Sequence, residues 1–145
     1  MTSSVKVIFL DIDDVLNTLP TRERGELFDS VNVEALNAVL DRTSAMIVMT
    51  STWRLCATLA EWEEILMNGG IHACERVLDV TPWIDGISRG AEIAYWLEHS
   101  LCEVSQYTIL DDRDDMAPFK DHLLRTTPEQ GLTQVLANLA ISRLH

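Results

Sequence analysis

Three carboxylates stand within four residues in the segment FLDIDDVLN, residues 9–17, directly behind an apolar run. Asp11, Asp13 and Asp14 would repel one another and lose solvation at the end of a buried strand, which is costly unless a cation or a reaction uses them. Side chains two positions apart in an extended chain face the same side, so Asp11 and Asp13 can act on one ligand. A lone DxD more often makes a turn or a helix cap, so its interpretation depends on the rest of the sequence.

Three further segments carry side chains that suit either a phosphoryl group or a metal ion. Thr50 and Ser51 offer hydroxyls and backbone N–H groups to phosphoryl oxygens, although Ser51 and Thr52 equally suit a helix cap. Arg89 stands at the expected start of a helix, where a cation can screen an anion; the alternative is an ordinary surface arginine. Asp111 and Asp112 supply the hard oxygen ligands that Mg²⁺ prefers.

Short apolar runs alternate with helical patterns along the whole chain. The pattern predicts helices over 31–42 (N-cap Ser30 or Asn32), 58–67, 89–101 (apolar face Ile93, Trp96, Leu97 and Leu101) and from Thr133, and strands over 5–10, 45–50, within 76–82, 106–110 and 122–127. The fold class expected is α/β, a three-layer Rossmann-like sandwich around a mainly parallel sheet. Parallel strands end at one edge, so the four segments should converge there.

Composition narrows the class of protein. The length of 145 residues corresponds to one domain, 1–145, and no apolar run approaches the roughly 20 residues that cross a bilayer. The N-terminus has no basic lead-in or cleavage site, so we expect a cytoplasmic protein. Three cysteines without a CxxC pair are expected to be reduced, small buried residues. The net charge of −12 disfavours an extended nucleic-acid surface.

The order DxD, hydroxyl, basic residue, acidic pair resembles the motifs of the haloacid dehalogenase-like (HAD) hydrolases, a superfamily of mostly magnesium-dependent phosphatases. Five segments resemble the branch described as the HAD domain of Swiss Army Knife RNA repair proteins. They are FLDIDDVLN, VMTSTWR, RGAEIAYWL, TILDDRDDM and HLLRTTPEQGLT. The resemblance implies that Asp11 is the nucleophile and a metal ligand. It implies that Asp13 is the general acid/base, with its carbonyl on Mg²⁺, and that Thr50, Ser51 and Arg89 bind the phosphate. Asp111 is then the leading metal ligand, and Asp112 is the second. Asp115 either supports these ligands without binding the metal directly or is only solvated.

Departures from the resembled pattern affect the expected function. Asp14 stands where a glycine is common, and the segments between motifs are too short for a cap domain, so an open site is expected. Such a site suits a small phosphomonoester, a nucleotide or a nucleic-acid end phosphate, and a second copy of the chain could cover it. The resembled superfamily also has lysine more often than arginine at the place of Arg89. The alternatives are a receiver-like signalling module and a catalytically weak metal-binding regulatory module.

Overall fold

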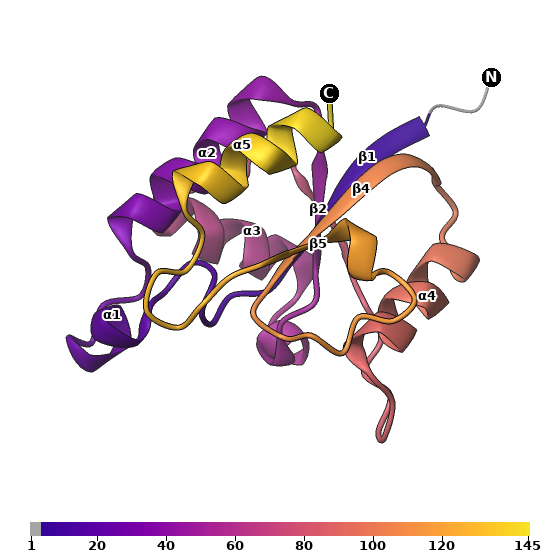
Figure 1. Cartoon of the computed structure of the whole chain (residues 1–145), viewed down its shortest axis with the longest axis horizontal. Helices are drawn as coiled ribbons and strands as arrows, with labels where there is room; N and C mark the ends of the chain where they lie inside the picture. Colours follow the sequence, from indigo (N-terminus) through magenta and orange to yellow (C-terminus); the bar gives the residue numbers. More distant parts are fainter. Residues whose placement is uncertain (1–3) are drawn as a thin grey trace.

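The computed structural model describes residues 4–145, except for the side chains of residues 54 and 55. Its centre is a sheet of five parallel strands in the order β3-β2-β1-β4-β5, which confirms the predicted α/β class (Figure 1). The strands are β1 (Ser4–Leu10), β2 (Met46–Met49), β3 (Val77–Val80), β4 (Glu103–Asp111) and β5 (Leu123–Arg125). The strand that carries the DxD segment, β1, is therefore the central one.

Helices cover both faces of the sheet, and side chains along β1 alternate between the two apolar cores that result. Ile8 and Leu10 belong to the core that α2 (Ser30–Arg42), α3 (Leu59–Asn68) and α5 (Gln134–Arg143) cover. Val7 and Phe9 belong to the opposite core, which α4 (Arg89–His99) covers. Figure 1 shows α2 and α5 lying together on one side of the sheet and α4 on the other. Burial on both faces explains why β1 is a continuous apolar run.

The predicted helices form with small changes at their ends. The N-cap of α2 is Asp29, whose carboxylate accepts hydrogen bonds from the N–H groups of Val31 and Asn32, so the prediction of Ser30 or Asn32 was wrong. Asn32 is buried instead, and its amide donates to the carbonyl of Leu132 at 2.8 Å. An aspartate satisfies a helix start as well as a serine does, so the residue types left the cap undecided.

Some surface features differ from the sequence-based expectations. Leu101 lies beyond the end of α4 and is fully exposed, so it does not join the apolar face of that helix. Cys56 and Cys74 are exposed and Cys102 is half-buried, so the prediction of buried cysteines was wrong. These residues lie at the surface ends of helical segments and in turns, where no apolar face requires burial. Helix α1 (Leu19–Glu23) and the 3₁₀ helices Thr52–Cys56 and Lys120–His122 were not predicted.

The segments between the strands leave no room for a separate domain. Residues 81–88 join β3 to α4, and only α1 and α2 lie between β1 and β2. Residues 4–145 thus contain no cap domain over the carboxyl ends of the strands, as expected. Within the same range, no helix combines the length and the apolar character needed to cross a membrane.

Candidate active site

Three strands of the sheet deliver polar residues to the same edge. The N–H of Asp11 donates to the carbonyl of Leu110, and the N–H of Thr50 donates to the carbonyl of Leu10. These bonds, of 3.1 and 2.9 Å, extend the β1–β4 and β1–β2 ladders by one step beyond the strands. Asp11, Thr50 and Asp111 therefore sit on adjacent strand ends, as the alternation of strands and helices predicted.

The loop that follows β1 is held by the apolar core. Ile12, Val15 and Leu16 are buried beneath the loop, with exposures of 1% or less. The N–H of Ile12 donates to the Asp11 carboxylate at 2.8 Å, and Asn17 donates its side-chain amide to the Asp13 carboxylate at 3.0 Å. The apolar residues between the acids thus fix the backbone, and each of the two acids has a hydrogen-bond donor that orients it.

Asp14 adopts the left-handed backbone conformation, with φ at +65°. Glycine reaches this region without strain, which gives a physical reason for the glycine in the resembled motif, and aspartate is among the residues that tolerate it best. The Asp14 carboxylate is paired with Arg22 of α1 at 2.8 Å, and the same Arg22 nitrogen reaches the Asn17 side chain at 2.9 Å. The extra carboxylate thus belongs to a local ion pair that ties α1 to the loop.

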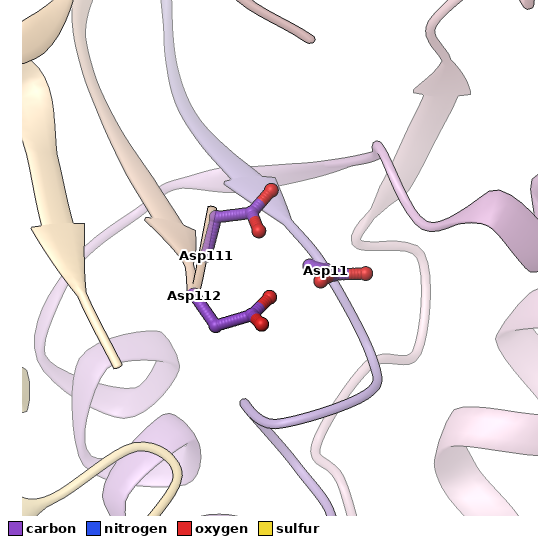
Figure 2. A group of neighbouring side chains, drawn as sticks. All are labelled: Asp11, Asp111 and Asp112. Atoms are coloured by element: carbon purple, nitrogen blue, oxygen red, sulfur yellow. The ribbon is translucent and has the colours of Figure 1, made fainter. Parts of the chain in front are cut away.

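Three carboxylates from β1 and β4 converge at the sheet edge. Asp11, Asp111 and Asp112 each offer an oxygen, and these oxygens lie within 4.8 Å of one another (Figure 2). The carboxylate of Asp13 is not part of this group, so its assignment as a ligand through the backbone carbonyl stays a prediction. Asp115 is also outside it, because its carboxylate binds Arg113 and accepts the N–H of Arg89. Clustered carboxylate oxygens without enough positive charge suit a hard divalent cation such as Mg²⁺.

Arg89 is a buried cation in contact with this cluster. It is the first residue of α4, is only 2% exposed, and pairs through Nη1 with Asp111 at 2.7 Å and with Asp11 at 3.5 Å. Its Nε is buried and has no hydrogen-bond partner among the described residues. The alternative of an ordinary surface arginine is therefore wrong. A buried N–H without an acceptor is rare and costly.

The protonation of the cluster reflects its burial. Burial, together with repulsion from Asp111, raises the pKa of Asp11 from 3.8 to about 8, although Arg89 acts in the opposite direction. Burial and the neighbouring Asp111 also raise the pKa of Asp112. One guanidinium shared between carboxylates does not compensate their charge, so the cluster retains a strong tendency to take up a proton or a cation.

The segment after β2 brings its hydroxyls to the same edge. Thr50 and Ser51 are both buried, and the Ser51 hydroxyl accepts the N–H of Trp53 at 3.2 Å as the N-cap of the 3₁₀ helix. The capping alternative considered for Ser51 is thus realised in the structure. Trp53 itself is 41% exposed, so it is not part of the core.

Several residues that support the site were missed by sequence reasoning. Gly90 is one: a Cβ there would lie 2.5 Å from the carbonyl oxygen of Ala117 and 2.7 Å from the Met116 carbonyl carbon. This close approach lets α4 begin against the loop that follows β4. Arg22 and Asn17 were missed as well, because ion pairs and hydrogen bonds within loops leave no periodic pattern in a sequence. The glycine at position 90, directly after Arg89, was the feature of the sequence that could have indicated this close approach.

Comparison with known proteins is consistent with this geometry. The sequence matches the family described as the HAD domain in Swiss Army Knife RNA repair proteins over residues 7–137, which include all four motifs. Neither the curated proteins nor the solved structures yielded a match. A match over this range, on a parallel sheet with the motifs at one edge, establishes the family. The chain belongs to the family described as the HAD domain in Swiss Army Knife RNA repair proteins, and so to a superfamily of phosphatase-type hydrolases.

Proposed function

We propose that the protein is a Mg²⁺-dependent phosphatase that hydrolyses a phosphomonoester through an aspartyl-phosphate on Asp11. The observation that carries the proposal is the buried arrangement of Asp11 between a carboxylate group and Arg89. A structural ion pair would need one carboxylate for one guanidinium, whereas three carboxylates converge beside this one. The excess of acceptors suits a cation, and the positive charge of Arg89 beside Asp11 suits a phosphoryl group.

The reaction would proceed in two displacements. An Asp11 oxygen attacks phosphorus, the bond to the leaving oxygen breaks, and Asp13 gives its proton to that oxygen. Asp13 then takes a proton from a water molecule, which attacks the phosphorus of the aspartyl-phosphate and releases inorganic phosphate. The carboxylate of Asp11 is restored. The hydrogen bond from Asn17 to Asp13 leaves one carboxyl oxygen of Asp13 for this proton transfer.

The other residues would stabilise charge on the transferred group. Arg89 would neutralise phosphoryl oxygens, and the Thr50 hydroxyl with the backbone N–H groups that follow β2 would bind others. Mg²⁺ held by Asp11, Asp111, Asp112 and the Asp13 carbonyl would supply positive charge that keeps the Asp11 carboxylate ionised. Without such charge, the raised pKa of Asp11 would leave much of this carboxyl protonated near neutral pH.

The proposed substrate is a nucleotide or a nucleic-acid end phosphate, because the family's description refers to RNA repair. The open edge suits a substrate that is itself large, since no cap excludes water. A second copy of the chain that covers the site is proposed as the alternative way to exclude water. The net charge of −12 argues that contacts stay close to the terminal phosphate rather than extending along a polyanion.

The test is release of inorganic phosphate from an aryl phosphate, nucleoside monophosphates and a 3′-phosphorylated oligonucleotide, with Mg²⁺ and with a chelator. We expect metal-dependent phosphate release by the wild type. In Asp11→Asn and in Asp13→Asn the rate of release should fall by about 100-fold or more. Asp121→Asn is the matched control, because Asp121 is exposed in the 3₁₀ helix that precedes β5.

The possible outcomes separate the alternatives. Turnover that survives in Asp11→Asn would exclude Asp11 as the nucleophile. Metal binding without phosphate release from any substrate would favour the catalytically weak or receiver-like module. Trapping of a phosphorylated protein whose label is lost in Asp11→Asn would support the covalent step directly.

A further inference from the structure

Asn17 links the proposed acid/base Asp13 to helix α1. Its side chain is only 2% exposed, and both polar atoms of its amide have hydrogen-bond partners. The Nδ2 of Asn17 donates to an Asp13 carboxyl oxygen at 3.0 Å. Its Oδ1 accepts from Nη1 of Arg22 at 2.9 Å and from the N–H of Asp14 at 3.1 Å. One buried amide therefore connects Asp13 to a cation that has no part in the phosphoryl transfer described above.

The neighbours of the Asn17 amide determine which of its two ends faces Asp13. Arg22 and the N–H of Asp14 can only donate, so the end of the amide that they contact has to be the oxygen. A rotated amide would set its N–H groups against these donors and its oxygen against the Asp13 carboxylate. Buried polar groups would then lack partners, which is costly. Arg22 therefore keeps the donor end of the amide on Asp13.

Arg22 is in turn held by Asp14. The two side chains are paired at 2.8 Å and are 33% and 15% exposed, so the ion pair is only partly solvated. The same Arg22 nitrogen also donates to the backbone carbonyl of Asn17 at 3.3 Å. A glycine at position 14 would supply the left-handed backbone conformation, but it would offer no carboxylate to Arg22. The aspartate at this position therefore fixes the guanidinium against the loop.

Helix α1, which carries Arg22, is anchored to two other segments. The hydroxyl of Thr21 is fully buried and donates to the Asp29 carboxylate at 3.0 Å. The N–H of Leu19 donates to the carbonyl of Pro128 at 2.7 Å. Arg22 thus extends from a fixed backbone, and such support is what a side chain needs in order to hold another residue in a productive orientation.

We propose that Arg22 and Asn17 are positioning residues for the general acid/base Asp13, and that Asp14 serves them by anchoring Arg22. The inference rests on the proposed phosphatase activity and assigns the residues that orient its proton donor. The Asn17 amide occupies one carboxyl oxygen of Asp13, so the second oxygen gives its proton to the leaving oxygen as the P–O bond breaks. Without either residue the carboxyl can rotate, and the donor is less often aligned with the leaving oxygen.

The test compares kcat/KM for two phosphomonoesters whose leaving groups differ in their need for a proton. Nitrophenolate departs without protonation, whereas the alkoxide of glycerol phosphate needs it. The value of kcat/KM includes only the steps up to departure of the leaving group, so slow hydrolysis of the aspartyl-phosphate does not mask the difference. We expect the ratio of nitrophenyl phosphate to glycerol phosphate to rise by about 10-fold or more in Asn17→Ala and by about 3-fold or more in Arg22→Met.

Three variants serve as controls. Arg22→Lys keeps a positively charged donor, so its ratio should stay close to that of the wild type. Asn37→Ala is the matched loss of an amide, because Asn37 of α2 donates to the Gly70 carbonyl and accepts the His72 N–H, each at 2.8 Å. It should lower the midpoint of urea unfolding without changing the ratio. Asp13→Asn should raise the ratio most, and adding Arg22→Met to it should raise the ratio no further.

Asp14 is left unchanged in these variants because its side chain also has a hydrogen-bonding contact with Asp112, so its replacement would alter the carboxylate group as well. Equal losses of kcat/KM for both substrates in Asn17→Ala and Arg22→Met would overturn the proposal, because damage to the fold slows every substrate alike. An unchanged ratio in Arg22→Met would also overturn it. That variant decides alone if Asn17→Ala does not fold, because the Arg22 side chain is partly exposed.

Failure of the underlying function gives a different result. If the wild type releases phosphate from neither substrate, the phosphatase proposal fails, and the positioning role fails with it. If the wild type is active and Asp13→Asn leaves the ratio unchanged, Asp13 is not the proton donor and the role is refuted. If Asp13→Asn raises the ratio and the Arg22 and Asn17 variants do not, only the positioning role is lost.

Discussion

Replacement of the proposed nucleophile by asparagine should make the metal-free protein more stable. The pKa of Asp11 is raised by burial and by Asp111 from 3.8 to about 8. The folded state therefore holds a proton that the unfolded state releases above its ordinary pKa. The contribution of this proton to the free energy of unfolding is fully present below pH 3.8 and is lost as the pH rises toward about 8. Asparagine does not titrate, so Asp11→Asn avoids this loss.

The size of the effect follows from the pKa values. Each pH unit between the unfolded and folded pKa values costs about 1.4 kcal/mol, so near pH 7 the cost approaches about 4 kcal/mol. We expect Asp11→Asn to exceed the wild type in free energy of unfolding by up to this amount, or by roughly 10 °C in Tm. The variant keeps the contact between Arg89 and Asp111, which spans 2.7 Å, so the guanidinium retains a partner.

Urea unfolding with a chelator, at several pH values between about 4.5 and 8.5, measures this difference. The gap should be small at the acid end and should widen toward neutral pH, and Mg²⁺ should narrow it by stabilising the wild type. Asp121→Asn, at an exposed position, controls for loss of a carboxylate as such. A variant that is no more stable than the wild type near pH 7, or a gap independent of pH, would refute the reasoning about the cluster.

Three further predictions concern the residues around the site. Asp14→Gly should be more stable than Asp14→Ala by about 1 kcal/mol in urea unfolding, because only glycine adopts the observed φ of +65° without strain; equal stability would contradict this. Gly90→Ala should cost about 1–3 kcal/mol and reduce phosphate release, because the added Cβ would lie 2.5 Å from the Ala117 carbonyl oxygen. A fully active and stable variant would show that the contact yields easily. Arg89→Lys should retain measurable phosphate release, whereas Arg89→Met should lose about 100-fold or more, because the proposed role needs a positive charge. Equal kcat for the lysine and methionine variants would remove Arg89 from the charge-stabilising role.

Local patterns in the sequence were enough to predict the five strands and four of the five α-helices that residues 4–145 form. The apolar run within residues 5–10 predicted a buried strand, and the structure confirms it, with Val7–Leu10 fully buried. Helix α1 was missed because its five residues, Leu19–Glu23, are too few to show an apolar period. The cysteines were misplaced because residue type alone does not determine burial.

The sequence by itself determined the chemistry that is available: acidic, hydroxyl and basic residues, each placed after an apolar run or at a helix start. The alternation of strands and helices was sufficient to predict that these groups share one edge of a parallel sheet. Only the tertiary structure decided which carboxylates meet, because Asp11 and Asp111 are 100 positions apart and become neighbours through the pairing of β1 with β4. It also decided that Arg89 is buried against them and that Asp14 pairs with Arg22. Distances and burial depend on contacts between distant segments, and such contacts leave no local periodicity in a single sequence.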